Sequence, residues 1–165
     1  MYDALFKENV RKKIRSKLNW TYDFLEKAQV ENYILRILVT DRTGLLIEDF
    51  RPKKSGNFTE IERKVSEFDG DMSAAFISGI LAQSDKLLLD TYDLLSESHI
   101  LSTQQGPTIL LYSITSDNYG AYLAIFTNGR EEALQKIGTG VNFLIYGLKT
   151  ILTELPAPEA AEEHG

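Results

Sequence analysis

The stretch "VTDRTGLLIEDF", residues 39–50, decides how the first part of the chain folds. Two segments rich in β-branched and apolar residues, 32–41 and 44–50, meet at the tetrapeptide Asp41-Arg42-Thr43-Gly44. Gly44 stands where a tight hairpin often needs a positive φ, and aspartate is a residue that caps the amides of a turn. The stretch therefore predicts two antiparallel strands joined by a short turn.

The same tetrapeptide also fits the D-x-x-G pattern of nucleotide hydrolases, in which the aspartate helps to hold magnesium. Such a site needs a phosphate-binding loop, G-x-x-x-x-G-K-S/T, and the chain contains no Gly-Lys pair. The adjacent carboxylates Glu48 and Asp49 alternate along a strand and are expected to face opposite sides of it. We therefore interpret Asp41 as a turn residue and expect no catalytic residue.

Composition narrows the class of protein. The chain has 165 residues, a net charge of −6 and no cysteine, which indicates one domain without disulfide or thiolate chemistry and is compatible with a cytoplasmic location. No apolar run is long enough for a transmembrane helix. The two histidines, His99 and His164, lie far apart, so we expect no histidine metal site, no Ser-His-Asp triad and no cofactor.

Charge is unevenly spread, because residues 1–64 are net basic and residues 65–165 strongly acidic. The acidic part disfavours nucleic acid as a partner, since phosphate binding needs clustered lysine and arginine. The basic run Arg11, Lys12, Lys13, Arg15 and Lys17 is the exception. It is interpreted either as the solvated face of a helix or as an electrostatic patch for an acidic partner or a membrane surface.

Apolar periodicity predicts an α+β domain in the order α-β-β-α-β-β-β-α, with a five-stranded, mainly antiparallel sheet and helices on both faces. The predicted helices span about 3–29 (with a break considered at Asn19), 72–96 (with Asp71 as N-cap) and 130–154, and a short helical turn is considered at 59–68. The further strands are at 99–105, 107–115 and 120–128. We expect one domain over 1–155, of which 1–14 is a helical N-terminal extension, and a disordered tail over 156–165.

The long helix 72–96 carries two different arcs at 100° per residue. The broad apolar arc, expected to cover the sheet, comprises Phe76, Ile77, Ile80, Leu81, Leu87, Leu88, Leu94 and Leu95. A second arc of small residues comprises Ala75, Ser78, Gly79 and Ala82, and Lys86 continues its line. This arc is either an exposed surface that happens to be small or a seam against a helix of another chain.

The strand 99–105 bears on that choice, because an edge strand leaves free N–H and C=O groups that invite pairing. A two-fold partner could satisfy the edge and the small arc together. The candidate dimer-interface residues are Ala75, Ser78, Gly79, Ala82, Lys86, His99, Ile100, Leu101, Ser102 and Thr103.

Over about residues 15–154 the sequence resembles the roadblock/dynein light chain family. The resemblance rests on the order of elements, on the hairpin "ILVTDRTGLLIEDF", on the helix "SAAFISGILAQS" and on "YLAIFTNGREEALQKIGTGVNFLIYGL" as last strand and helix. It implies a roadblock-like sandwich that pairs with itself or with a paralogous chain through a continuous sheet. It also implies a non-catalytic scaffold or adaptor that binds or regulates a small Ras-like GTPase.

In that family the paired long helices often form the platform for the GTPase. Carried over to this chain, the residues expected to be exposed for a partner are Gln83, Asp85 and Asp90. The alternatives are a ligand-sensing domain of the PAS/GAF or profilin-like kind and a longin-type trafficking module. The former needs a pocket with convergent polar groups.

Overall fold

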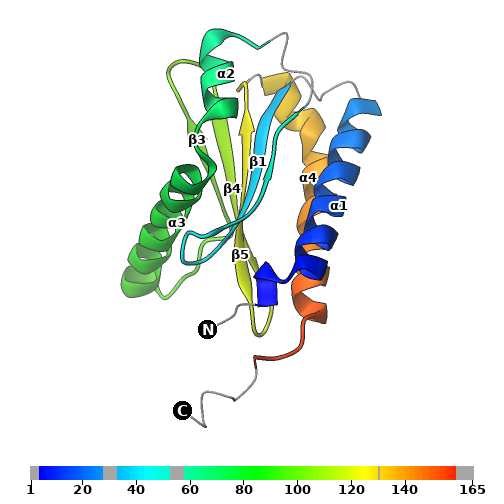
Figure 1. Cartoon of the computed structure of the whole chain (residues 1–165). Coiled ribbons are helices and arrows are strands. Elements are labelled where there is room, and N and C mark those ends of the chain that lie inside the picture. Colours follow the sequence, from blue (N-terminus) through cyan, green and yellow to red (C-terminus); the bar gives the residue numbers. More distant parts are fainter. Residues whose placement is uncertain (1–3, 28–32, 53–57, 130, 159–165) are drawn as a thin grey trace.

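The structure, a computed structural model, describes residues 4–27, 33–52, 58–129 and 131–158. The elements in chain order are η1 (Ala4–Phe6), α1 (Glu8–Lys27), β1 (Ile34–Asp41), β2 (Leu46–Phe50), α2 (Glu60–Glu67), α3 (Gly70–Tyr92), β3 (Ser98–Ser102), β4 (Thr108–Thr115), β5 (Gly120–Thr127) and α4 (Glu131–Glu154) (Figure 1). The α+β prediction is confirmed. The short turn considered at 59–68 is a separate helix, so the observed order is α-β-β-α-α-β-β-β-α.

The five strands form one sheet in the order β2-β1-β5-β4-β3, and every neighbouring pair is antiparallel. The central strands β1 and β5 are almost entirely buried. The strands β2 and β3 form the two edges. The strand predicted at 99–105 is observed as β3, which ends at Ser102, and it lies at an edge of the sheet as considered from the sequence.

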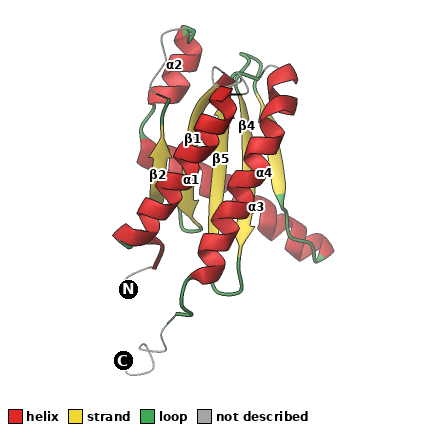
Figure 2. Ribbon diagram, turned by 90° about the vertical axis from the view of Figure 1, so that its right-hand side faces the viewer, coloured by secondary structure: helices red, strands yellow, loops and turns green. Residues whose placement is uncertain are grey.

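Helices cover both faces of the sheet. The long helices α1 and α4 lie side by side on one face, and α2 and α3 lie on the other (Figures 1 and 2). Alternation along β1 divides its side chains between the two cores. Ile37 and Val39 belong to the core under α1 and α4, whereas Leu38 belongs to the core under α3.

The helix α1 continues without interruption past Asn19, so the considered break does not occur. Its buried stripe includes Val10, Ile14, Leu18 and Leu25. The stripe packs with α4 residues in one cluster that also contains Leu5 from η1. The N-terminal residues of this helix are thus part of the same core as the last helix.

Two glycines bring α4 close to α1. A Cβ added at Gly140 would lie 2.9 Å from Leu25 Cδ2, and one added at Gly147 would lie 3.0 Å from Lys17 Cδ. Gly140 thus lies near Leu25, and the later Gly147 lies near the earlier Lys17, so the two helices run antiparallel.

Capping side chains set where the helices of the other layer begin. Thr59 and Glu62 form a capping box at the start of α2. The N-cap of α3 is Asp69, whose carboxylate accepts a hydrogen bond from the Met72 amide at 2.9 Å. The sequence-based choice of Asp71 was therefore wrong by two residues, because Asp69 precedes a glycine that starts the helix. Asp93 ends α3 in the left-handed conformation.

The chain end is described as far as Pro158. The Tyr119 hydroxyl donates a hydrogen bond to the Pro156 carbonyl oxygen at 2.6 Å. Most of the disordered tail that the sequence predicts, including His164, lies outside the described residues.

Candidate partner-binding surface

The turn at Asp41 uses its carboxylate within the hairpin. One oxygen, Oδ1, accepts hydrogen bonds from the Thr43 amide at 2.9 Å, the Thr43 hydroxyl at 2.7 Å and the Leu45 amide at 2.9 Å. Gly44 has φ +97°, and a Cβ there would lie 2.6 Å from Ser78 Oγ. The interpretation of Asp41 as a turn residue is confirmed.

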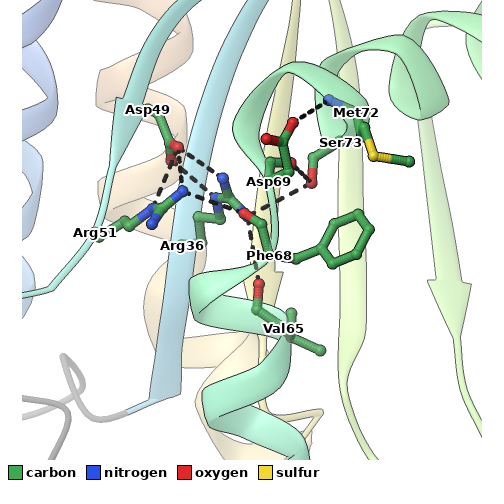
Figure 3. A network of polar contacts seen from close by, with 8 residues as sticks. All are labelled: Arg36, Asp49, Arg51, Val65, Phe68, Asp69, Met72 and Ser73. Carbon is green, nitrogen blue, oxygen red and sulfur yellow. Dashed lines mark hydrogen bonds and ion pairs between the residues drawn. The ribbon is translucent and has the colours of Figure 1, made fainter.

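A buried ion pair joins the two strands of this hairpin. The guanidinium of Arg36, which is fully buried, meets Asp49 at two points, with Nε to Oδ1 at 2.8 Å and Nη2 to Oδ2 at 2.6 Å (Figure 3). Arg51 Nη2 adds a contact to Asp49 Oδ2 at 3.0 Å. Burial acts to raise the pKa of Asp49, but the hydrogen bonds and charges of Arg36 and Arg51 together hold that pKa below its ordinary value.

The same arginines fix the corner between α2 and α3. Arg36 Nη1 donates to the Val65 carbonyl at 3.4 Å and lies 3.5 Å from the Ser73 hydroxyl. Arg51 Nη2 donates to the Phe68 carbonyl at 3.2 Å (Figure 3). Sequence reasoning missed this cluster. The available signal was one cation inside the apolar segment "NYILRILVTD", since a buried cation needs a partner.

Glu48 lies on the opposite face, as expected from its alternation with Asp49. Arg15 Nη2 is 2.9 Å from Glu48 Oε1, and Arg11 Nε is 3.3 Å from the same oxygen. The hydrogen bond and charge of Glu48 raise the pKa of Arg15. Two members of the basic run are thus tied to β2, whereas Lys12, Lys13 and Lys17 are exposed.

The helix α3 touches the sheet through a narrower arc than the sequence predicts. Its buried residues are Ser73, Ala74, Ile77, Ser78 and Leu81. Ile80 and Leu88 are half-buried, whereas Phe76, Leu87, Leu94 and Leu95 are 55%, 70%, 57% and 73% exposed. Assigning these last four to the sheet was wrong.

The physical reason is angle. At 100° per residue, Phe76 and Leu87 lie roughly 100–120° around the helix from the centre of the buried arc at Ile77 and Leu81, so they point away from the strands. Leu94 and Leu95 follow the end of α3 and do not share its rotation.

Ser78 is a second correction, because it faces the hairpin turn of its own chain and is buried there. The other members of the small arc, Ala75, Gly79 and Ala82, are exposed, as is Lys86. A Cβ at Gly79 would meet nothing within 4 Å. Most of the candidate seam is therefore accessible, while Ser78 serves packing within the chain.

The edge strand β3 alternates between exposed and half-buried residues. His99 and Leu101 pair with Leu111 and Ile109, which belong to the core under α3, so they face that layer. Ile100, 67% exposed, lies on the other face of the sheet. His99 Nε2 is buried without a hydrogen-bond partner among the described residues.

The residues at the end of β3 and directly after it lead into the turn to β4. Ser102 and Thr103 are exposed, and the Thr103 hydroxyl donates to the Pro107 carbonyl at 2.6 Å, which closes the turn to β4.

The three residues expected to be exposed for a partner are not alike. Gln83 and Asp90 are exposed on α3. Asp85 is half-buried, and its Oδ1 accepts hydrogen bonds from the Ser96 amide at 3.2 Å and from the Ser96 hydroxyl. Burial and the charge of Asp85 raise the pKa of Tyr122 in β5. The expected exposure of Asp85 was therefore wrong, because it holds the connection from α3 to β3.

The remaining surface shows a depression of about 300 Å³ on the outside of α4, lined by Tyr146, Lys149, Thr150, Thr153 and Glu154. All of these residues come from one helix, so the depression is not enclosed between elements. Within the described ranges no group of three or more His, Asp or Glu side chains is placed to hold a metal ion. None of the helices that the structure describes is both long and apolar enough to cross a membrane.

Comparison with known proteins shows similarity in structure only. No family model matches the sequence, and no curated protein matches it. Among solved structures, the gliding protein MglB from Thermus thermophilus matches with a TM-score of 0.59 and 14% identity, over 92% of this chain and 93% of that one. A structure of MglB with a tetrameric arrangement matches with the same TM-score, 0.59, and 12% identity, over 92% of this chain and 93% of that one.

The Roadblock/LC7 domain from Streptomyces avermitilis matches with a TM-score of 0.54 and 13% identity, over 73% of this chain and 86% of that one. The resemblance noted in the sequence is thus confirmed at the level of structure. With its five antiparallel strands between two helical layers, the chain has the roadblock-like α+β fold.

Proposed function

We propose that this chain is a non-catalytic, cytoplasmic scaffold that pairs with a second roadblock-like chain and binds a small Ras-like GTPase. The observation that carries the proposal is the exposure of large apolar side chains on α3, Phe76 and Leu87, in a molecule that also has an open sheet edge at β3. Exposed apolar patches mark interaction sites, and an unpaired edge strand is a template for another strand.

The second chain is the first partner. Pairing of β3 with β3 of a second copy would continue the sheet across a two-fold axis perpendicular to it, so that both α3 helices would lie on the same side. The MglB structure with a tetrameric arrangement supports association of such folds. The proposed interface includes Ala75, Gly79, Ala82 and Lys86 of α3, and residues 99–103 of β3 and the turn after it. Phe76 and Leu87 lie beyond Gln83 and Asp90 around the helix, so they belong to its outward face.

The GTPase is the second partner, and it would supply the chemistry. Support comes from the family resemblance and from the outward face of α3, where Gln83 and Asp90 are exposed. A carboxylate at the rim of an interface acts chiefly on the association rate and on its salt dependence. Asp90 therefore suits a basic patch on the GTPase.

The test is a binding titration with small GTPases from the same genome, loaded with GDP or with a non-hydrolysable GTP analogue. We expect one GTPase to bind, with Asp90→Lys slowing its association several-fold at low salt and much less at high salt. The matched control is Asp117→Lys in the β4–β5 turn, also exposed, which should bind like wild type. Failure of every GTPase to bind, or equal rates for Asp90→Lys and wild type, would contradict the proposed platform.

A further inference from the structure

The face of the molecule opposite α3 carries an exposed aromatic cluster between α1 and α4. Trp20 stacks on Phe24 with ring centroids 5.7 Å apart, and both rings meet Phe143 edge-on at 5.7 and 5.9 Å. Trp20 is 50% exposed, Phe143 51%, and Tyr146, one turn further along α4, 73%. We call Trp20, Phe24, Phe143 and Tyr146 the aromatic crest.

Lysines flank the crest on both helices. Lys13 and Lys17 precede Trp20 by about two turns and one turn of α1, which places them on the same flank. On α4, Lys136 lies about two turns before Phe143, and Lys149 about one turn after Tyr146. All four are exposed. In a protein with net charge −6, this face therefore gathers positive charge around exposed aromatic rings.

From this arrangement we propose that the α1–α4 face docks on an anionic lipid surface. Tryptophan and tyrosine favour the level of the lipid headgroups, and lysines are attracted to a negatively charged leaflet. Long lysine stems lie along apolar surface while their charges stay in water. The two helices would lie flat on the bilayer, with the crest in the headgroup region.

The type of cation favours lipid over a protein partner. Lysine is depleted in protein–protein interfaces, whereas arginine is enriched there. The arginines of α1, Arg11 and Arg15, lie on its other flank and are tied to Glu48. The crest is thus bordered by lysines. Their ammonium groups are compact and strongly hydrated, which suits a diffuse layer of anionic headgroups.

The proposed docking does not depend on the proposed function. If the chain also forms the continuous-sheet dimer proposed above, both crests would face the same side, and both α3 helices would face away from the membrane. That arrangement of the dimer would present the GTPase platform to the cytoplasm. Only this arrangement depends on the dimer, and the lipid docking itself does not.

Trp20 is the only tryptophan, so its fluorescence reports directly on the crest. The full chain is titrated with vesicles of phosphatidylcholine containing phosphatidylglycerol, and with vesicles of phosphatidylcholine alone. We expect a blue shift of the emission and quenching by brominated lipid only with the anionic vesicles. Both effects should be reversed at about 1 M salt, where charges are screened within about 3 Å.

Substitutions then test whether this face, and not another part of the surface, binds the vesicles. Lys13→Glu with Lys17→Glu should weaken vesicle binding by at least about tenfold, since each lysine near the surface contributes roughly 1 kcal/mol. Phe143→Ser should also weaken it. The matched controls are Lys64→Glu on α2 and Phe68→Ser, whose side chain is 48% exposed, and both should bind vesicles like wild type.

Three outcomes would overturn the proposal: no binding of the wild type to anionic vesicles at low salt, binding without a change in Trp20 emission, or equal binding by the double lysine variant. Light scattering and GTPase titration of the double lysine variant distinguish the lipid proposal from the scaffold proposal. Loss of vesicle binding with normal association and GTPase binding would support the lipid face and leave the scaffold role untouched.

Discussion

At the residue scale, Asp41 is a structural acceptor in a motif that otherwise suggests nucleotide chemistry. We expect Asp41→Ala to lower the free energy of unfolding by about 1–3 kcal/mol, because the buried hairpin loses three hydrogen bonds to one oxygen. Denaturant titration measures this, with Asp117→Ala in an exposed turn as the control. Calorimetry should find no GTP binding to the wild type or to the Asp41→Ala variant. GTP binding by the wild type that Asp41→Ala abolishes would contradict the turn assignment.

Asp49 makes the free energy of unfolding depend on pH in the acid range. Its pKa in the folded chain lies below the ordinary value of 3.8, so the folded state binds the proton more weakly than the unfolded state. The stabilisation is therefore present above pH 3.8 and is lost as the pH falls through the folded pKa. We expect the wild type to lose stability in this window.

Replacing Asp49 tests the linkage. Asp49→Asn should cost about 3 kcal/mol near neutral pH, since it leaves the buried Arg36 without its counter-charge. The loss of stability on acidification should also be smaller in the variant. Unfolding free energies measured between neutral pH and pH values below the ordinary pKa of aspartate check both points. Parallel curves for variant and wild type would rule out a role for Asp49 in the acid dependence.

At the scale of elements, α3 has more apolar surface than its own sheet covers. We expect Ala75→Asp to weaken self-association, because the exposed Ala75 side chain on the small arc would bury against a second chain. Light scattering at concentrations on the order of 100 μM, where even weak dimers form, measures this. Leu45→Asp, at a leucine 60% exposed in the hairpin turn, is the control. A monomeric wild type at that concentration would contradict the interface.

Gly79 gives a sharper test of the small arc. An added side chain meets nothing in the monomer, and glycine inside a helix costs about 1 kcal/mol relative to alanine. Gly79→Arg should therefore leave the stability of the monomer unchanged or raised while weakening association. Ala82→Arg on the same arc should behave alike. If both variants associate like wild type, the small arc is simply exposed surface.

At the scale of the whole molecule, the C-terminal segment contributes little to the core. Ending the chain at Pro158 should leave the melting temperature unchanged, because residues 159–165 contain no apolar stripe. Ending it at Leu155 removes the Pro156 carbonyl that binds the Tyr119 hydroxyl, a loss of about 1 kcal/mol. Thermal unfolding of both truncations distinguishes them. A clear drop for the chain ending at Pro158 would show that the tail stabilises the fold.

Local patterns predicted the elements, because capping, turn chemistry and apolar period act over a few residues. The hairpin, its Asp41 turn and the opposite orientation of Glu48 and Asp49 all follow from that range. The start of α3 was misplaced because Asp69 and Asp71 both suit an N-cap, and only the observed start of the helix at Gly70 separates them. Helix start signals are therefore reliable to within a residue or two.

What the sequence by itself determined is the α+β class, the order of the five strands and three long helices along the chain, and the absence of a phosphate-binding loop. Only the tertiary structure decided which apolar residues of α3 face the sheet, that Arg36 is neutralised by Asp49, and that Asp85 is held by Ser96. The physical reason is that helical period records which residues share a face, and not which neighbour that face meets. Partners far apart along the chain are set by packing, and Phe76 and Leu87 remain exposed because the sheet meets only the arc of α3 around Ile77 and Leu81.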